Sequence, residues 1–122
     1  MDTILVVDDE AHIAQVIALL LAEEGLVVLT AGDGQEALTI ALEEQPRLVL
    51  TDVMMPRMDG LELCRRLRDD PATSATVVLL MSAAVVTDPS GCGATGVIRK
   101  PFELDDLVMT VRRHLIRPLP PA

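Results

Sequence analysis

Five short runs of apolar, largely β-branched residues recur along this chain, and they constrain its fold more than any other feature. The runs lie at 3–7 (TILVV), 26–31 (LVVLTA), 47–51 (RLVLT), 76–81 (TVVLLM) and 96–99 (GVIR). Runs that are apolar on both faces are typical of buried parallel strands. Helical patterns at 10–24, 34–45, 60–68 and 103–116 alternate with them. The alternation predicts the α/β class, with five parallel strands in a doubly wound sheet.

The first three helical patterns carry apolar faces and start signals. Residues 10–24 place five apolar side chains on one predicted buried face, namely Ile13, Val16, Ile17, Leu20 and Leu21. Asp33-x-x-Glu36 and Asp59-x-x-Glu62 resemble capping boxes with aspartate as the cap.

The segment between the fourth and fifth strands, 82–100 (SAAVVTDPSGCGATGVIRK), is a poor helix. Parallel strands need a crossover, usually a helix. Pro89 cannot occupy a helix interior, and Gly91 and Gly93 weaken one. We therefore expect the fourth helix of the fold to be degraded or missing, with about one turn remaining at most.

Length and charge limit the possible functions. A chain of 122 residues suits one domain, which we place at 1–116, followed by a Pro-rich tail or linker at 117–122 (RPLPPA). A net charge of −9 argues against direct nucleic-acid contact, and no apolar run could insert into a membrane. Cys64 and Cys92 fit no zinc spacing, so we interpret them as reduced thiols. Without a signal-peptide pattern, we expect a cytoplasmic protein.

Polar residues gather where the predicted strands end, at Asp8, Asp9, Asp52, Ser82 and Lys100. Taken singly, each has an ordinary explanation, such as Asp9 capping the following helix. Together they matter, because ligands of parallel sheets bind beyond the carboxyl ends of the strands.

The residue types in this set favour phosphoryl chemistry. Crowded carboxylates repel one another and need a cation, and oxygen ligands suit Mg²⁺ or Mn²⁺. A carboxylate can act as nucleophile while a metal and a lysine neutralise phosphoryl oxygens. Nine of the ten basic residues are arginine, so the single lysine, Lys100, indicates that a compact charge is needed there.

Four motifs, VVDDE (6–10), LTDVMMPRMDGLEL (50–63), LLMSA (79–83) and RKPF (99–102), resemble those of receiver domains of two-component response regulators. The resemblance covers nearly the whole chain. It implies a flavodoxin-like sheet of order 2-1-3-4-5. It also implies that Asp52 accepts a phosphoryl group from a sensor histidine kinase or a histidine phosphotransfer protein.

The same resemblance implies roles for the other residues. Asp9, Asp52 and the backbone carbonyl of Met54 would bind Mg²⁺, with Asp8 binding directly or through water. Lys100 would contact the acyl phosphate, and Ser82 would hydrogen-bond a phosphoryl oxygen. The resemblance further implies a cis Lys100–Pro101 bond and a site mouth shaped by Pro56, Asp59 and Gly60.

Two features depart from the family. Receivers commonly carry an aromatic switch residue three positions before the lysine, where this chain has Val97, which we expect simply to pack. Phe102, the only aromatic residue, is expected in the core. A weak fourth helix would expose apolar surface, and we hypothesise that a second copy or an effector covers the face of that helix, the fifth strand and the last helix.

Three other functions remain open. A phosphatase with an aspartate nucleophile would need a second aspartate two residues after Asp52, where Met54 stands. An FMN-binding protein would need a neutral phosphate loop in place of DDE. A degenerate receiver would act as an interaction module without phosphorylation.

Overall fold

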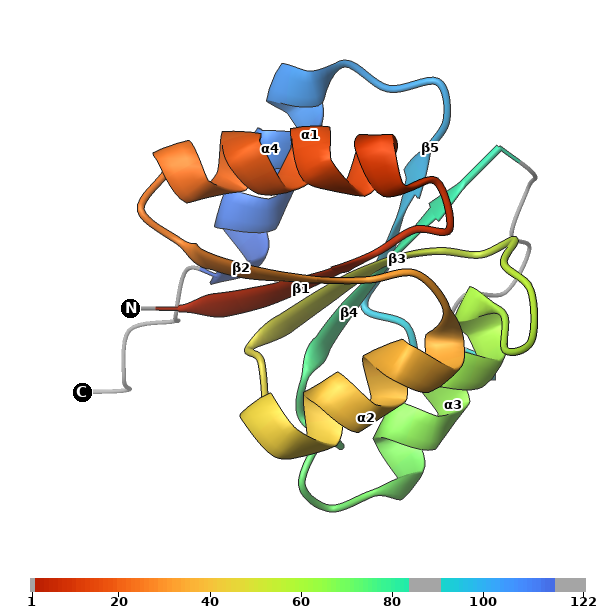
Figure 1. Ribbon diagram of the computed structural model, residues 1–122. Coiled ribbons are helices and arrows are strands. Elements are labelled where there is room, and N and C mark those ends of the chain that lie inside the picture. Colours follow the sequence, from red (N-terminus) through yellow and green to blue (C-terminus); the bar gives the residue numbers. More distant parts are fainter. Residues whose placement is uncertain (1, 84–90, 116–122) are drawn as a thin grey trace.

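The computed structural model describes residues 2–83 and 91–115 (Figure 1). Its five strands form one parallel sheet in the order β2-β1-β3-β4-β5, as predicted. The strands are β1 (Thr3–Val7), β2 (Val27–Ala31), β3 (Leu48–Asp52), β4 (Val77–Ser82) and β5 (Gly96–Arg99). Their bounds differ by at most one residue from the apolar runs of the sequence.

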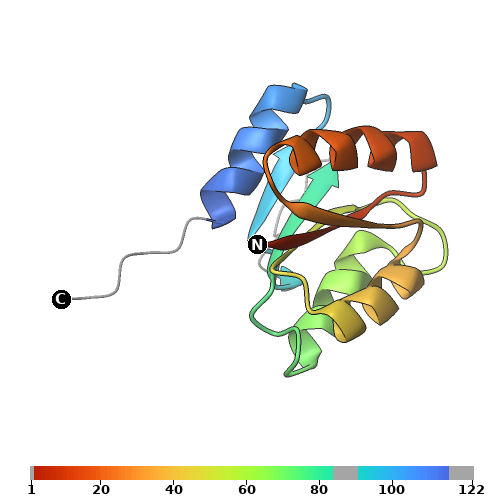
Figure 2. The ribbon, with the colours of Figure 1, turned by 60° about the vertical axis from the view of Figure 1, so that its left-hand side comes forward.

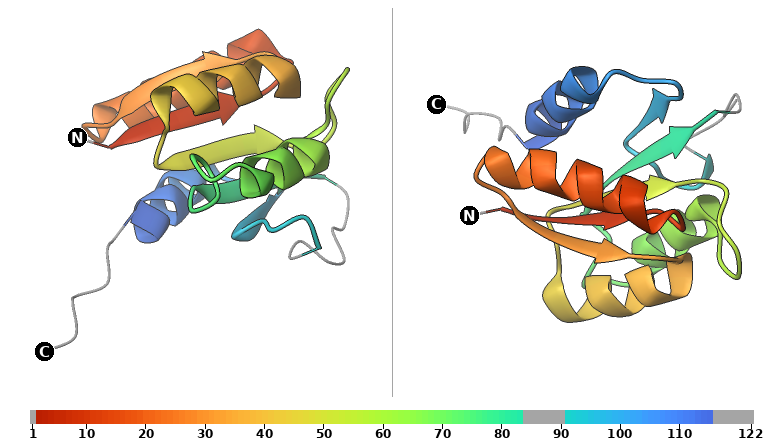
Figure 3. Two further views of the ribbon diagram at one scale, coloured as in Figure 1. Left: turned by 90° about the horizontal axis from the view of Figure 1, so that it is seen from below. Right: turned by 45° about the horizontal axis from the view of Figure 1, so that its top comes forward.

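Helices cover both faces of the sheet. They are α1 (Ala11–Glu23), α2 (Gly34–Glu44), α3 (Gly60–Asp69) and α4 (Leu104–Leu115). As Figures 1 and 2 show, α1 and α4 lie on one face, and α2 and α3 lie on the other. The two views of Figure 3 confirm this three-layer arrangement.

Each face of the sheet has its own aliphatic core. Under α1 and α4, Ile4 and Val6 of β1 pack with Ile17, Leu107 and other apolar residues. Under α2 and α3, the alternate β1 residues Leu5 and Val7 pack with the second set of helices. The sheet is thus apolar on both sides, which leaves its edges and strand ends for polar groups.

Both predicted Asp caps are present. Asp33 Oδ1 accepts a hydrogen bond from the Glu36 amide, and Asp59 Oδ1 accepts one from the Glu62 amide, each at 2.8 Å. The first helix differs from expectation. Glu10 is its N-cap residue and makes no side-chain cap, so Asp9 does not cap this helix. Val16, expected on the buried face, is 44% exposed.

Only part of the crossover between β4 and β5 can be compared with the prediction. Residues 84–90 lie outside the described part of the chain, as does the tail at 117–122. The described crossover residues 91–95 form no α-helix, and the four α-helices found in 2–83 and 91–115 fit a reduced fourth helix. No helix in these ranges is long and apolar enough to span a membrane.

Val97 and Phe102 lie where the sequence indicated. Val97 of β5 is half-buried against the core under α2 and α3, and it pairs with Leu80 of β4. Phe102 is partly buried against the core under α1 and α4. The position of the family's switch aromatic is therefore filled by a small packed side chain.

Candidate functional site

The carboxyl ends of four strands bring the predicted polar residues to one edge of the sheet. Asp8 follows β1, Asp52 and Ser82 end β3 and β4, and Lys100 follows β5. Backbone hydrogen bonds fix two of these ends, since Lys100 N donates to Ser82 O at 2.9 Å and Asp8 N donates to Ala31 O at 3.1 Å. The parallel register therefore assembles groups that are far apart in sequence.

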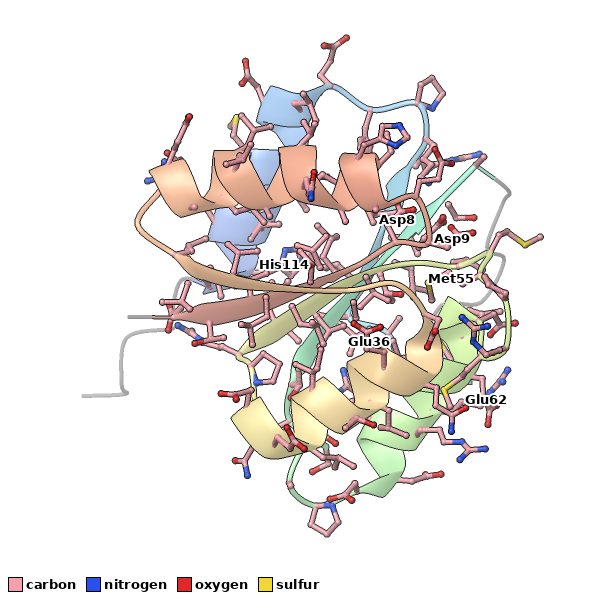
Figure 4. The ribbon with its side chains drawn as sticks, viewed as in Figure 1. Asp8, Asp9, Glu36, Met55, Glu62 and His114 are labelled. Atoms are coloured by element: carbon pink, nitrogen blue, oxygen red, sulfur yellow. The ribbon has the colours of Figure 1, made fainter. Side chains whose placement is uncertain are left out.

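Three carboxylates meet at this edge. One oxygen each from Asp8, Asp9 and Asp52 lies within 4.8 Å of the other two. Asp8 is 2% exposed and Asp52 is 8% exposed, whereas Asp9 faces solvent. Figure 4 shows Asp8 and Asp9 at the end of β1, with Met55 of the β3–α3 loop at the same edge.

Asp8 is the most constrained of the three. Its Oδ1 accepts a hydrogen bond from Glu10 N at 2.9 Å, and its buried Oδ2 has no hydrogen-bond partner among the described residues. Burial raises the pKa of this carboxyl, and the nearby charges of Asp52 and Asp9 raise it further, against the lowering effects of the Glu10 amide and Lys100. A buried oxygen without a partner beside two other carboxylates fits a hard cation such as Mg²⁺.

Lys100 supplies positive charge next to Asp52. Its Nζ lies 3.4 Å from Asp52 Oδ2, and the two side chains are 30% and 12% exposed. The Lys100–Pro101 peptide bond is cis, as the resemblance implied. Ser82, 2% exposed, lies at the adjacent strand end. The structure therefore brings together the whole predicted set of side chains.

The β3–α3 loop closes tightly behind Asp52. A Cβ on Gly60 would collide with the carbonyl oxygen of Asp52, so only glycine fits there. Gly60 N donates to Val53 O at 2.9 Å, and Asp59 caps α3. Met54, whose carbonyl was predicted as a metal ligand, carries a 75% exposed side chain.

An open cleft of about 380 Å³ adjoins the carboxylates. Asp8 and Lys100 line it together with residues that the sequence analysis did not place at the site, including Glu10, Ile13, Ala83 and Phe102. Three of them directly follow the acidic pair, the serine and the cis proline in the sequence, which was the available signal; Ile13 had no such signal. The cleft gives the site an apolar flank.

Comparison with known proteins places this arrangement in a family. Residues 4–112 match the response regulator receiver domain. The chain belongs to this family. The receiver domain is 40% identical over 124 residues to the DNA-binding response regulator MtrA of Mycobacterium tuberculosis, covering 96% of this chain and 54% of MtrA. It is 36% identical over 117 residues to the probable transcriptional regulatory protein TcrX of the same species, covering 94% and 50%. The receiver domain thus spans about half the length of these relatives.

Solved structures agree with the family assignment. The chemotaxis response regulator CheY4 of Vibrio cholerae superposes with a TM-score of 0.89 at 33% identity, covering 94% of this chain and 99% of CheY4. The receiver domain of the Francisella response regulator 1452 gives a TM-score of 0.83 at 31% identity, covering 93% and 96%. This receiver domain therefore belongs to two-component signal transduction, with the flavodoxin-like, CheY-like fold.

Proposed function

We propose that this receiver domain accepts a phosphoryl group on Asp52 from the phosphohistidine of a sensor histidine kinase or a histidine phosphotransfer protein. The observation that carries the proposal is the position of Asp52, beside two further carboxylates and with one oxygen 3.4 Å from the Lys100 ammonium nitrogen. Few structural roles need three carboxylates and the only lysine of an acidic chain at one point. A carboxylate oxygen can act as the nucleophile, and the neighbouring ammonium supplies positive charge for the phosphoryl oxygens.

In the proposed reaction, an Asp52 carboxylate oxygen attacks phosphorus. The new O–P bond forms as the P–N bond to the donor imidazole breaks, and the imidazole leaves with the electron pair of that bond. Lys100 neutralises the charge on the phosphoryl oxygens, and the Ser82 hydroxyl donates a hydrogen bond to one of them.

The donor set fits Mg²⁺, or Mn²⁺, as the metal. Asp8, Asp9, Asp52 and the Met54 carbonyl would hold it through oxygen atoms alone. When bound, the ion supplies positive charge that offsets the carboxylates and the incoming phosphoryl group. The buried Oδ2 of Asp8, which has no hydrogen-bond partner in the described part of the chain, supports this assignment.

We infer that output runs through protein contacts in the cytoplasm. The domain is a signalling module whose only chemistry is its own phosphorylation and dephosphorylation. Contacts with a second copy or an effector would use the face of the crossover, β5 and α4. The relative MtrA is named DNA-binding, but the match covers only 54% of its length, and we propose no direct nucleic-acid contact for this acidic domain.

Phosphorylation with a small donor tests the proposal. Incubation with acetyl phosphate and Mg²⁺ is expected to add the mass of one phosphoryl group, labile to hydroxylamine, to the wild type and not to Asp52→Asn. A wild type that gains no phosphate points to the degenerate receiver instead. Equal modification of Asp52→Asn refutes the assignment of Asp52.

Replacement of Lys100 tests the need for a compact charge. We expect Lys100→Arg to phosphorylate more slowly, because a planar forked guanidinium replaces a point charge in a partly buried site. The initial rate with acetyl phosphate measures this, and Arg99→Lys, one residue earlier and exposed, is the control. Equal rates for Lys100→Arg and the wild type contradict the proposed role.

A further inference from the structure

The loop at 53–59, between Asp52 and α3, is tied to the start of α2 by an ion pair. Arg57 Nε and Nη2 both donate to Asp33 Oδ2, at 3.2 and 2.8 Å. Arg57 has a φ of 67°, a left-handed conformation that residues with a Cβ rarely adopt. Such a conformation persists where surrounding contacts determine it, and it is frequent next to functional sites.

Asp33 is a firm anchor for this contact. Its second oxygen, Oδ1, accepts the Glu36 amide at 2.8 Å and thereby caps α2. The Glu36 amide and the Arg57 guanidinium, in that order, lower the pKa of Asp33, so its carboxylate is ionised at neutral pH. The Asp33 side chain is only 12% exposed, so the helix cap and the ion pair hold it in a mostly buried position.

A backbone contact beside the ion pair reinforces it. A Cβ on Gly34, the first residue of α2, would collide with the carbonyl oxygen of Met58. Met58 is 7% exposed within the core, and its amide donates to Pro56 O at 2.8 Å. The Gly60 amide closes the loop onto Val53 O. Met54 lies in the span between these fixed points.

We infer that Arg57 is a positioning residue, whose ion pair with Asp33 holds the loop that carries the Met54 backbone carbonyl, the proposed fourth metal ligand. The inference rests on the proposed function, because it assigns a device that sets the metal affinity of the same site. Within the described residues, neither Arg57 nor Asp33 forms a hydrogen bond or ion pair with the site carboxylates or Lys100.

A purely electrostatic role makes the opposite prediction for one variant. Loss of the Arg57 charge would then tighten Mg²⁺ binding to an acidic site, and loss of the Asp33 charge would weaken it. A positioning role weakens binding in both cases, because either change breaks the same pair. Asn at position 33 still caps the helix, so Asp33→Asn removes the pair and keeps α2.

The experiment compares the wild type, Arg57→Ala, Asp33→Asn and the double variant in Mg²⁺ titrations followed by amide NMR shifts. We expect both single variants to bind Mg²⁺ about threefold to fivefold more weakly and the double variant to bind no more weakly than either, given the usual strength of a partly exposed ion pair. Arg57→Lys should recover part of the affinity. Thermal unfolding of each variant shows whether the domain stays folded.

Arg112→Ala is the matched control. Arg112 is 65% exposed against 66% for Arg57, and it pairs with Glu24 at 3.0 Å after the far end of α1. Its removal should leave Mg²⁺ affinity unchanged. Opposite shifts for Arg57→Ala and Asp33→Asn, or wild-type affinity in both, overturn the inference alone. A wild type that binds no Mg²⁺ overturns the proposed metal site as well.

Discussion

At the scale of one residue, the buried carboxylate of Asp8 lowers the folding stability of the metal-free domain at neutral pH. Burial raises its pKa in the folded state, so the folded protein binds a proton at this carboxyl more tightly than the unfolded chain does. Its contribution to stability is therefore favourable at low pH. That contribution falls as pH rises from 3.8, the ordinary pKa of an aspartate, through the raised pKa of the folded state, and it stays lost at neutral pH.

Asp8→Asn should consequently stabilise the metal-free domain. In EDTA at pH 7 we expect its Tm to exceed that of the wild type by several degrees, which corresponds to about 1 kcal/mol for a domain of this size. The difference should shrink toward pH 4. Asp9→Asn, at an exposed carboxylate, should change Tm less. A lower Tm for Asp8→Asn at pH 7 would show that the Asp8 charge is not destabilising.

Cys64 should be nearly inert in the folded domain. It is fully buried, and burial, together with the neighbouring Cys92, raises its pKa from 9.0 to about 12. Because the thiolate is the nucleophile, this rise lowers its reactive fraction at pH 8 about a thousandfold. Alkylation with N-ethylmaleimide, followed by mass spectrometry of Cys92→Ser, should label Cys64 only after unfolding. Rapid labelling of the folded variant contradicts this expectation.

At the scale of the element, the Arg68 side chain of α3 binds the segments that immediately precede β4 and β5. The Arg68 guanidinium donates to Gly93 O at 2.8 Å, to Ser74 O at 3.0 Å and to Thr76 O at 2.6 Å, and it contacts Thr95 Oγ1 at 3.4 Å. Gly93 has a φ of 88°, and a Cβ there would press on Arg68. This contact fastens the described end of the crossover, 91–95, to the helix layer.

Arg68→Ala should therefore destabilise the domain by about 2 kcal/mol, since carbonyl oxygens lose charged donors. Urea unfolding followed by circular dichroism measures this loss. Arg65→Ala is the control on the same helix, because Arg65 is 54% exposed and its one ion pair within the described residues is an i,i+3 contact with Glu62. Equal unfolding midpoints for the two variants would mean that the contacts of Arg68 add nothing to stability.

At the scale of the whole molecule, the predictable part of the structure is the part that periodicity and topology determine. Apolar runs located the strands, and parallel order placed Asp8, Asp52, Ser82 and Lys100 at one edge. Local rules were less reliable for α1. The predicted cap, Asp9, does not cap the helix, and Asp8 instead accepts a hydrogen bond from the Glu10 amide just before it. The helical period predicts a broad apolar face, and it does not show that Val16, at the edge of that face, is exposed.

The contacts of Arg57 and Arg68 could not be predicted from the sequence. They join residues 24 and 25 positions apart, through a left-handed loop residue and a glycine of positive φ. Neither spacing nor composition specifies such loop paths, because they depend on how layers pack around the sheet.

Metal binding should stabilise the whole domain by mass action. A ligand that binds only the folded state at ten times its Kd adds about 1.4 kcal/mol, or a rise in Tm of about 5 °C. A chain of net charge −9 also gains from simple screening, so Mg²⁺ must be compared with NaCl at equal ionic strength. We expect the extra rise in the wild type and in Glu43→Gln, an exposed carboxylate of α2, but not in Asp52→Asn. Differential scanning calorimetry measures all three, and identical curves in the two salts would exclude a specific site.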